Sequence, residues 1–304
     1  MPQEFDFLIL AGPTASGKSG LAIQIADQMN GEIINADSMQ VYKDLSILTA
    51  RPSENPVSHH LYGVLTAQEM GSAAWWQDQA LGLIQDCLDR SKLPILVGGT
   101  GLYLHTLTHG LSSIPTIDPA VRQKVRQLCV EMGEDFSEYV YGIDPLLRGH
   151  INPSDPQRLS RALEVFLQTD QSFLTWRGNK GPLHSFRHRY VVIDLERTQL
   201  YEQINKRFHL MVEQGAIQEV ETLRKLDIPE GSPLLKAIGV PEISDYLDGQ
   251  LTLEAAIEKA QQSTRNYAKR QMTWFRQQVS KKIVLSEAHL DTLLKKLTEV
   301  KGEA

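Results

Sequence analysis

The chain has 304 residues, of which 41% are hydrophobic and 22% charged, close to the average for soluble globular proteins. Wholesale disorder is therefore excluded, and the length suits one large domain or two moderate ones. The formal charge of −6, from 31 basic and 37 acidic residues, argues against a protein coated in basic residues for nucleic-acid binding. Cys87 and Cys129 are the only cysteines, which excludes a disulfide scaffold and a cysteine-based zinc site. With no visible secretory signal or membrane-spanning run, we expect a cytoplasmic protein without membrane association.

Short apolar runs alternate with helical periodicity over the first hundred residues. The runs predict buried strands at 7–11, 32–36 and 93–97. Apolar residues at helical spacing predict helices from Ser19 to Met29 and from Trp75 to Arg90. This alternation is typical of an α/β domain with a parallel sheet.

After about residue 116 the strand pattern stops, and helical periodicity broken by turns runs over 118–169. Asp155-Pro156 predicts an N-cap with a first-turn proline, and the helix after it is expected to bury Leu159, Leu163 and Phe166.

The strand pattern returns at 190–195. Two long helical stretches, 199–226 and 253–278, and a short strand at 283–285 follow. The predicted organisation is an α/β core, residues 1–117 and 190–304, interrupted by a helical insertion domain at 118–189.

The segment after the first strand matches G-x-x-x-x-G-K-[ST] in full and stands between a predicted strand and a predicted helix. It comprises Gly12, Pro13, Thr14, Ala15, Ser16, Gly17, Lys18 and Ser19. Its glycines let backbone N–H groups surround phosphate oxygens, Lys18 adds a full charge, and the Ser19 hydroxyl can hold Mg²⁺. The motif predicts phosphate binding on a P-loop NTPase-like core, without identifying the phosphate compound.

Two polar clusters follow the next two strands. The Asp37 carboxylate would face the ligand crevice, holding Mg²⁺ through water or acting as a general base; a helix N-cap is the competing role. The segment 98–101, Gly-Gly-Thr-Gly, allows close backbone approach, and Thr100 offers a hydroxyl and an N–H to an anion; a simple tight turn would use the same residues. A motor-type ATPase often carries a second acidic residue here, and its lack argues against that class.

Basic residues are concentrated in two segments, 171–190 and 264–282, that contain no acidic residue. They hold ten of the 31 basic residues, leaving 21 against 37 acidic residues elsewhere. We expect a basic surface on an acidic body, which suits a phosphate-backbone ligand, although a solvated helix face would look similar. His59-His60 favours a structural role over a metal site, because no third ligand is evident.

These segments together resemble the tRNA dimethylallyltransferase family, also called tRNA isopentenyltransferases. The matching motifs run in family order over nearly the whole chain. They are GPTASGKS (12–19), DSMQVY (37–42), TARP (49–52), HHL (59–61), LVGGTGLY (96–103), DP with VR (118–122), NP with DPQRLSRALEV (152–165), and TRNYAKRQ with TWF (264–275).

The resemblance implies transfer of a dimethylallyl group from dimethylallyl diphosphate to N6 of adenosine at tRNA position 37, beside the anticodon. Diphosphate leaves. Asp37 would accept the N6 proton. Thr100, Arg207, Lys18, the P-loop amides and Mg²⁺ at Ser19 would stabilise the leaving diphosphate.

The resemblance also implies that the insertion grips the anticodon stem-loop. The implied tRNA-binding residues are Asp37, Ser38, Met39, Gln40, Thr100, Arg122, Gln157, Arg158, Leu159, Ser160, Arg161, Lys236 and Gly239. We expect the protein to act as a monomer. The chain departs from the family pattern at Leu48, usually glycine, and at Val240 and Pro241.

Three alternatives stay open at the level of the sequence. One is a P-loop kinase for a small metabolite, with the insertion as a lid over ATP. Another is a nucleotide-dependent RNA-binding module without chemistry. The last is an adenylate isopentenyltransferase, which prenylates free adenine nucleotides on the same fold; the helical insertion and residues 157–161 argue against it.

Overall fold

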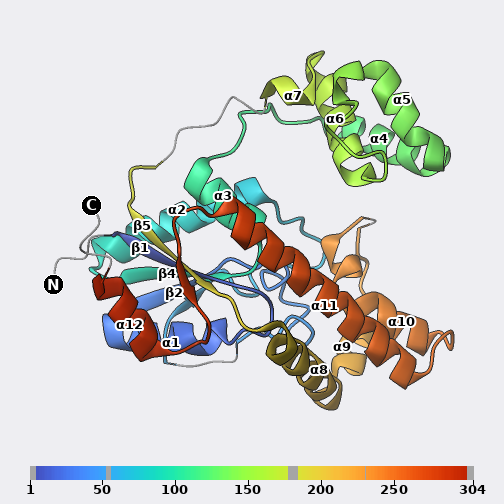
Figure 1. The fold of residues 1–304 in the computed structure, drawn as a ribbon. Coiled ribbons are helices and arrows are strands. Elements are labelled where there is room, and N and C mark those ends of the chain that lie inside the picture. The colour runs from blue at the N-terminus through green and yellow to red at the C-terminus, as the bar shows by residue number, and fades with distance from the viewer. Residues whose placement is uncertain (1–4, 53–55, 177–183, 230, 300–304) are drawn as a thin grey trace. The chain divides into compact units, whose positions relative to one another are not determined.

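The computed structural model describes residues 5–52, 56–176, 184–229 and 231–299 (Figure 1). The chain divides into two compact units, residues 1–107 with 185–304, and residues 108–184. The second unit therefore spans slightly different residues from the insertion expected at 118–189. Within the described residues, every helix is too short or too polar to cross a bilayer.

A parallel sheet forms the centre of the first unit (Figure 1), and its described strands run in the order β3-β2-β4-β1-β5-β6. Their bounds are β1 (Phe7–Ala11), β2 (Gly31–Asn35), β3 (His59–His60), β4 (Leu93–Gly98), β5 (His188–Ile193) and β6 (Ile283–Leu285). Every residue of β1 and β4 is buried, as expected for a parallel sheet covered on both faces. Five strands confirm the sequence prediction within two residues, and β3 was not predicted.

Alternate residues of β1 pack into two separate hydrophobic cores, because successive side chains point to opposite faces of a strand. Leu8 and Leu10 pack on one face with α1 (Lys18–Met29). Phe7 and Ile9 pack on the other with α2 (Ala73–Asp89) and α3 (Gly101–His109). The sheet therefore fixes where β1 ends and where the phosphate-binding motif begins.

A third core forms between the segment 41–67 and the helices that follow β5. They are α8 (Arg197–Glu213), α9 (Ala216–Leu223), the short 3-10 helix η3 (Pro233–Lys236), α10 (Val240–Leu247) and α11 (Leu253–Gln278). The prediction of one helical stretch over 199–226 was wrong, because Gly215 takes a left-handed conformation (φ 104°) and separates α8 from α9. The last helix, α12 (Leu290–Glu299), and α3 and α10 were not predicted.

The longest elements in the described part of the second unit are helices. Its elements are α4 (Pro119–Met132), η1 (Gly133–Asp135), α5 (Phe136–Ile143), η2 (Pro145–Leu147), α6 (Pro156–Thr169) and α7 (Phe173–Trp176). The predicted N-cap is confirmed, because Asp155 Oδ1 accepts a hydrogen bond from Arg158 N at 3.1 Å. Leu159 and Leu163 join Val125 and Phe136 in this unit's own core, while Phe166 is only half-buried.

Two glycines offer a matched test of packing. A Cβ on Gly101, at the start of α3, would lie 2.4 Å from the Trp274 ring on α11, whereas a Cβ on the exposed Gly82 of α2 would meet nothing within 4 Å. Gly101→Ala is therefore expected to lower the free energy of unfolding by about 1–3 kcal/mol through overpacking. Gly82→Ala should raise it by about 0.5–1 kcal/mol through helix propensity. Urea unfolding of both variants checks the pair, and equal effects would contradict the packing of α11 on the turn.

Candidate active site

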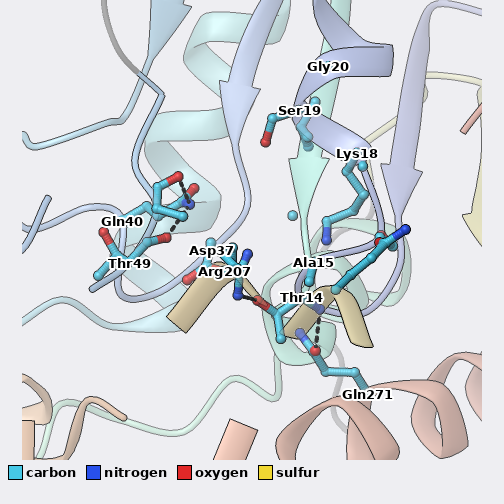
Figure 2. A pocket seen from close by; sticks show the side chains of 16 residues that line it. Thr14, Ala15, Lys18, Ser19, Gly20, Asp37, Gln40, Thr49, Arg207 and Gln271 are labelled. Carbon is cyan, nitrogen blue, oxygen red and sulfur yellow. Dashed lines mark hydrogen bonds between the residues drawn. The ribbon is translucent and has the colours of Figure 1, made fainter. Parts of the chain in front are cut away.

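A pocket of about 390 Å³ opens at the carboxyl edge of the sheet, where ligands bind in doubly wound folds (Figure 2). It is lined by residues 14–20, which span the phosphate-binding loop and the start of α1, by the segment after β2, by the end of β4, and by α8 and α11. The lining residues outside the loop are Asp37, Gln40, Thr49, Ala50, Val97, Gly98, Gln203, Arg207 and Gln271. The structure thus brings the predicted Lys18, Ser19, Asp37 and Arg207 into one cavity.

The phosphate-binding loop connects β1 to the first turn of α1, as its motif predicts. Gly17 has a left-handed φ of 82° before the helix begins at Lys18. Lys18 Nζ donates to Pro13 O at 2.6 Å, and Thr14 Oγ1 accepts a hydrogen bond from Arg207 Nη2. Arg207 reaches the loop from α8, nearly two hundred residues later in the chain, so it was predictable only through the resemblance.

The pocket holds more positive than negative charge. Burial lowers the pKa of Lys18 to about 8, an effect opposed by the Asp37 carboxylate and increased by Arg207. Burial likewise lowers the pKa of Arg207 to about 10, again opposed by Asp37. Two partly desolvated cations facing one carboxylate favour an anionic ligand, because an anion would relieve their repulsion.

Asp37 lies directly after β2 in a turn, and no helix starts there, so the alternative of a helix N-cap is wrong. Its Oδ1 accepts a hydrogen bond from Met39 N at 2.9 Å. Its backbone is held on both sides by the buried Asn35, whose Oδ1 accepts from Asp37 N at 2.8 Å and whose Nδ2 donates to Asp37 O at 3.0 Å. The carboxylate is therefore placed in the pocket by a fixed backbone.

Thr100 ties the glycine turn after β4 to the Asp37 segment. Its Oγ1 accepts a hydrogen bond from Ser38 N at 2.9 Å, and its own N–H donates to Ala36 O at 3.2 Å. A Cβ on Gly98 would lie 2.1 Å from Ala36 O, and one on Gly99 would lie 2.1 Å from Gln271 Nε2. The close approach that these glycines allow is therefore to neighbouring protein atoms.

The residues expected to contact tRNA are divided between the two units. In the first, Asp37 and Gln40 line the pocket, with Ser38 and Met39 between them half-buried in the same turn. In the second, Arg122, Gln157 and Arg158 are exposed, and Ser160 and Arg161 are half-buried.

Some expected contacts have other partners in the fold. Leu159 is 1% exposed, so its side chain packs inside the unit. Arg161 Nη1 lies 3.1 Å from Glu164 Oε2, and Arg158 Nε lies 3.5 Å from Asp155 Oδ2. These arginines are already partly neutralised.

Leu48, one departure from the family pattern, lies next to Gly239, which directly precedes the other departures, Val240 and Pro241. Gly239 is buried at the N-terminus of α10, and a Cβ there would lie 2.6 Å from Leu48 Cδ2. Lys236, three residues earlier, is exposed. Leu48 and the segment around Gly239 therefore form one local packing unit within the third core.

The adjacent histidines belong to β3 at the edge of the sheet. His60 Nε2 lies 2.7 Å from Glu32 Oε2, and Cys87 Sγ lies 3.7 Å from the same oxygen. These three side chains have metal-ligand geometry, but Arg90 already binds both carboxylate oxygens and lowers the pKa of Glu32 to about 2. This arrangement favours a structural role for His60.

Some side chains of the two basic segments form ion pairs within the fold. Arg187 pairs with Asp6, and Arg276 pairs with Asp194. Lys269 and Arg270 are exposed on α11. Arg177 and Lys180 lie outside the described residues.

Gln203 and Gln271 line the pocket but were not predicted from the sequence. For Gln271 a signal was present. The buried positions of α11 include Ala260, Thr264, Ala268 and Phe275, and Gln271 falls in the same stripe. A polar side chain at a buried helical position needs hydrogen-bond partners, so the sequence indicates a buried polar contact without showing where its partners lie.

A parallel sheet with a phosphate-binding loop and a pocket of excess positive charge at its carboxyl edge defines a P-loop α/β protein. A family model described as "IPP transferase" matches residues 40–278, and one described as "Isopentenyl transferase" matches residues 5–70.

Curated relatives match over most of their length. The tRNA dimethylallyltransferase of Granulibacter bethesdensis is 43% identical over 274 residues, which cover 88% of this chain and 86% of the relative. That of Rickettsia felis is 43% identical over 286 residues, which cover 92% and 93%.

Solved structures agree with these relatives. The tRNA isopentenylpyrophosphate transferase of Bacillus halodurans superposes with a TM-score of 0.68 at 34% identity, covering 97% of this chain and 93% of that one. A eukaryotic dimethylallyltransferase acting on tRNA superposes with a TM-score of 0.79 at 26% identity, covering 97% and 77%. This chain belongs to the IPP transferase family.

Proposed function

We propose that this protein transfers a dimethylallyl group from dimethylallyl diphosphate to N6 of adenosine at position 37 of tRNA, with release of diphosphate. The observation that carries the proposal is the pocket that joins Lys18 and Arg207, two cations suited to a diphosphate, to the single carboxylate of Asp37. The relatives that match over 88% and 92% of the chain are named tRNA dimethylallyltransferase.

In the proposed reaction, N6 of adenosine forms a bond to C1 of the dimethylallyl group while the bond between C1 and the diphosphate oxygen breaks. The electron pair of that bond leaves with the diphosphate. The Asp37 carboxylate accepts the N6 proton, since an exocyclic amine is a poor nucleophile without a base. Lys18, Arg207 and the loop amides stabilise the charge that grows on the leaving group.

We propose Mg²⁺ as the metal ion. Ser19 Oγ lines the pocket and offers the hard oxygen ligand that this ion prefers. When bound, the ion would supply further positive charge to the diphosphate oxygens.

The nucleophile reaches the pocket only if adenosine leaves its stack in the anticodon loop. We assign the grip on the anticodon arm to the second unit, through its exposed Arg122, Gln157 and Arg158. We further propose that the protein works as a monomer in the cytoplasm.

The test is to incubate the protein with Mg²⁺, dimethylallyl diphosphate and an unmodified tRNA that has adenosine at position 37, and to analyse the nucleosides by mass spectrometry. We expect dimethylallyladenosine at position 37, and diphosphate release only when both substrates are present. Release of ADP from ATP would favour a metabolite kinase, and modification of free AMP in place of tRNA would favour an adenylate isopentenyltransferase.

The affinity for tRNA should fall steeply as salt rises, because phosphate contacts release counterions. Arg122→Ala is expected to reduce the slope of log affinity against log salt by about 1, the contribution of one phosphate contact. Arg148→Ala is the matched control in the same unit, because Arg148 pairs with Glu138 and stacks over Tyr141. Filter binding across a salt series measures both slopes. A salt-independent affinity would contradict the proposed mode of tRNA binding.

A further inference from the structure

Gln271 is a buried polar side chain whose amide is used at both ends. It extends from α11, is 5% exposed, and reaches the floor of the pocket (Figure 2). Its Oε1 accepts a hydrogen bond from Thr14 N at 2.9 Å. Its Nε2 donates to Gly99 O at 2.9 Å. One side chain therefore joins the phosphate-binding loop to the turn after β4.

Each end of this amide continues into a different half of the site. On the loop side, Thr14 Oγ1 accepts a hydrogen bond from Arg207, which faces the diphosphate position. On the other side, Gly99 precedes Thr100, whose Oγ1 accepts from Ser38 N next to Asp37. Gln271 is thus the middle of a chain of contacts that runs from the leaving-group side to the base side.

Packing along α11 holds this side chain in place. A Cβ on Gly99 would lie 2.1 Å from Gln271 Nε2, so the turn fits closely around the amide. One helical turn earlier, burial raises the pKa of the Tyr267 hydroxyl, and the neighbouring side chains of Thr100 and Gln271 lower it. One turn later, Trp274 covers Gly101. A single stripe of α11 therefore packs on Gly99 and Gly101 of the glycine turn, while Gly98 packs on Ala36.

We propose that Gln271 is a positioning residue that fixes the distance and angle between the diphosphate-binding half and the Asp37 half of the site. The inference rests on the proposed group transfer, in which the attacking nitrogen, C1 and the leaving oxygen must be in line. Reacting atoms in such a step are held about 3–3.5 Å apart, and a misplacement of about 1 Å costs about 100-fold in rate. The hydrogen bonds of Gln271 go to Thr14 N and Gly99 O, and not to Lys18, Arg207 or the Asp37 carboxylate.

The test compares Gln271→Met, which keeps the volume and removes both hydrogen bonds, with Gln271→Glu, which keeps an acceptor for Thr14 N and loses the donor to Gly99 O. Gln277→Ala, exposed on the same helix, is the control. Single-turnover transfer should slow by about 100-fold in both Gln271 variants. In Gln271→Met the dissociation constants for dimethylallyl diphosphate and for tRNA should stay at the wild-type values. Gln271→Glu adds a negative charge to the pocket lining, so its rate is compared at saturating donor. Gln277→Ala should match the wild type throughout.

Wild-type rates in Gln271→Met would overturn the inference, as would a loss of donor affinity with an unchanged rate at saturation, which would make Gln271 a binding residue. If circular dichroism shows that Gln271→Met does not fold, the transfer rate of Gln271→Glu is compared with that of the wild type instead. A wild-type protein that transfers nothing overturns the proposed function and this inference together. An active wild type with undiminished variants overturns only the inference.

Discussion

Asp37→Asn is expected to lower the rate of dimethylallyl transfer by about 10²- to 10⁴-fold, the usual contribution of a positioned general base. Asparagine keeps the size of the side chain and the Oδ1 acceptor that receives the Met39 N–H at 2.9 Å. The turn held by Asn35 should therefore persist. Only the basic oxygen that takes the N6 proton is lost. Single-turnover rates with enzyme in excess over tRNA measure the effect on the chemical step.

The control for this variant is Asp27→Asn, an exposed carboxylate on α1 that lies outside the pocket lining. It removes the same charge from the chain and should leave the rate unchanged. A rate in Asp37→Asn within tenfold of the wild type would mean that another group accepts the proton. That result would remove Asp37 from the role of general base and leave the transfer activity itself in place.

The strands that the sequence predicted are those whose hydrophobic runs suffice to define them. β1 and β4 are buried at every residue, and their pattern is visible without any partner. β3 is different, because two histidines form a strand only by pairing with β2, where Ile33 faces His59. The break between α8 and α9 was missed because Met211, Ala216 and Val220 are all buried on either side of Gly215. Helical periodicity continued across the break, and only the glycine marked it.

The parts of the site formed by neighbouring residues in the sequence could be predicted. The parts that depend on how distant segments pack together could not. The loop that holds Lys18 is a contiguous motif, so its place between β1 and α1 followed from the sequence. Gln271 comes from a helix more than 250 residues later, and its contact with Thr14 depends on how α11 crosses the sheet edge. The choice between general base and N-cap for Asp37 likewise required knowing that no helix starts there.

Arg207→Gln is expected to lower the transfer rate by about 10²- to 10³-fold, the cost of removing one donor that stabilises charge in the transition state. The variant also loses the hydrogen bond to Thr14 Oγ1. Arg207→Lys keeps a positive charge without the planar donor geometry, so it should recover part of the rate. Equal rates for glutamine and lysine would mean that the charge itself contributes little.

Arg207→Gln and Asp37→Asn are also expected to shift the pH dependence of donor affinity, in opposite directions. Lys18 must be protonated to attract the donor, and its pKa in the empty pocket is about 8, so donor affinity should fall above that pH. The last ionisation of a phosphate ester lies near pH ~6, so the donor itself does not titrate between pH 7 and 9.

Arg207 lowers the pKa of Lys18 and Asp37 raises it, so removing Arg207 should move the alkaline fall in affinity to higher pH, and removing the Asp37 charge should move it to lower pH. Calorimetric titration with dimethylallyl diphosphate, without tRNA so that no transfer occurs, measures both shifts. Lys18→Met should bind weakly and show no such fall. If the fall in affinity shifts in the same direction in both variants, Lys18 is not the group whose titration controls donor binding.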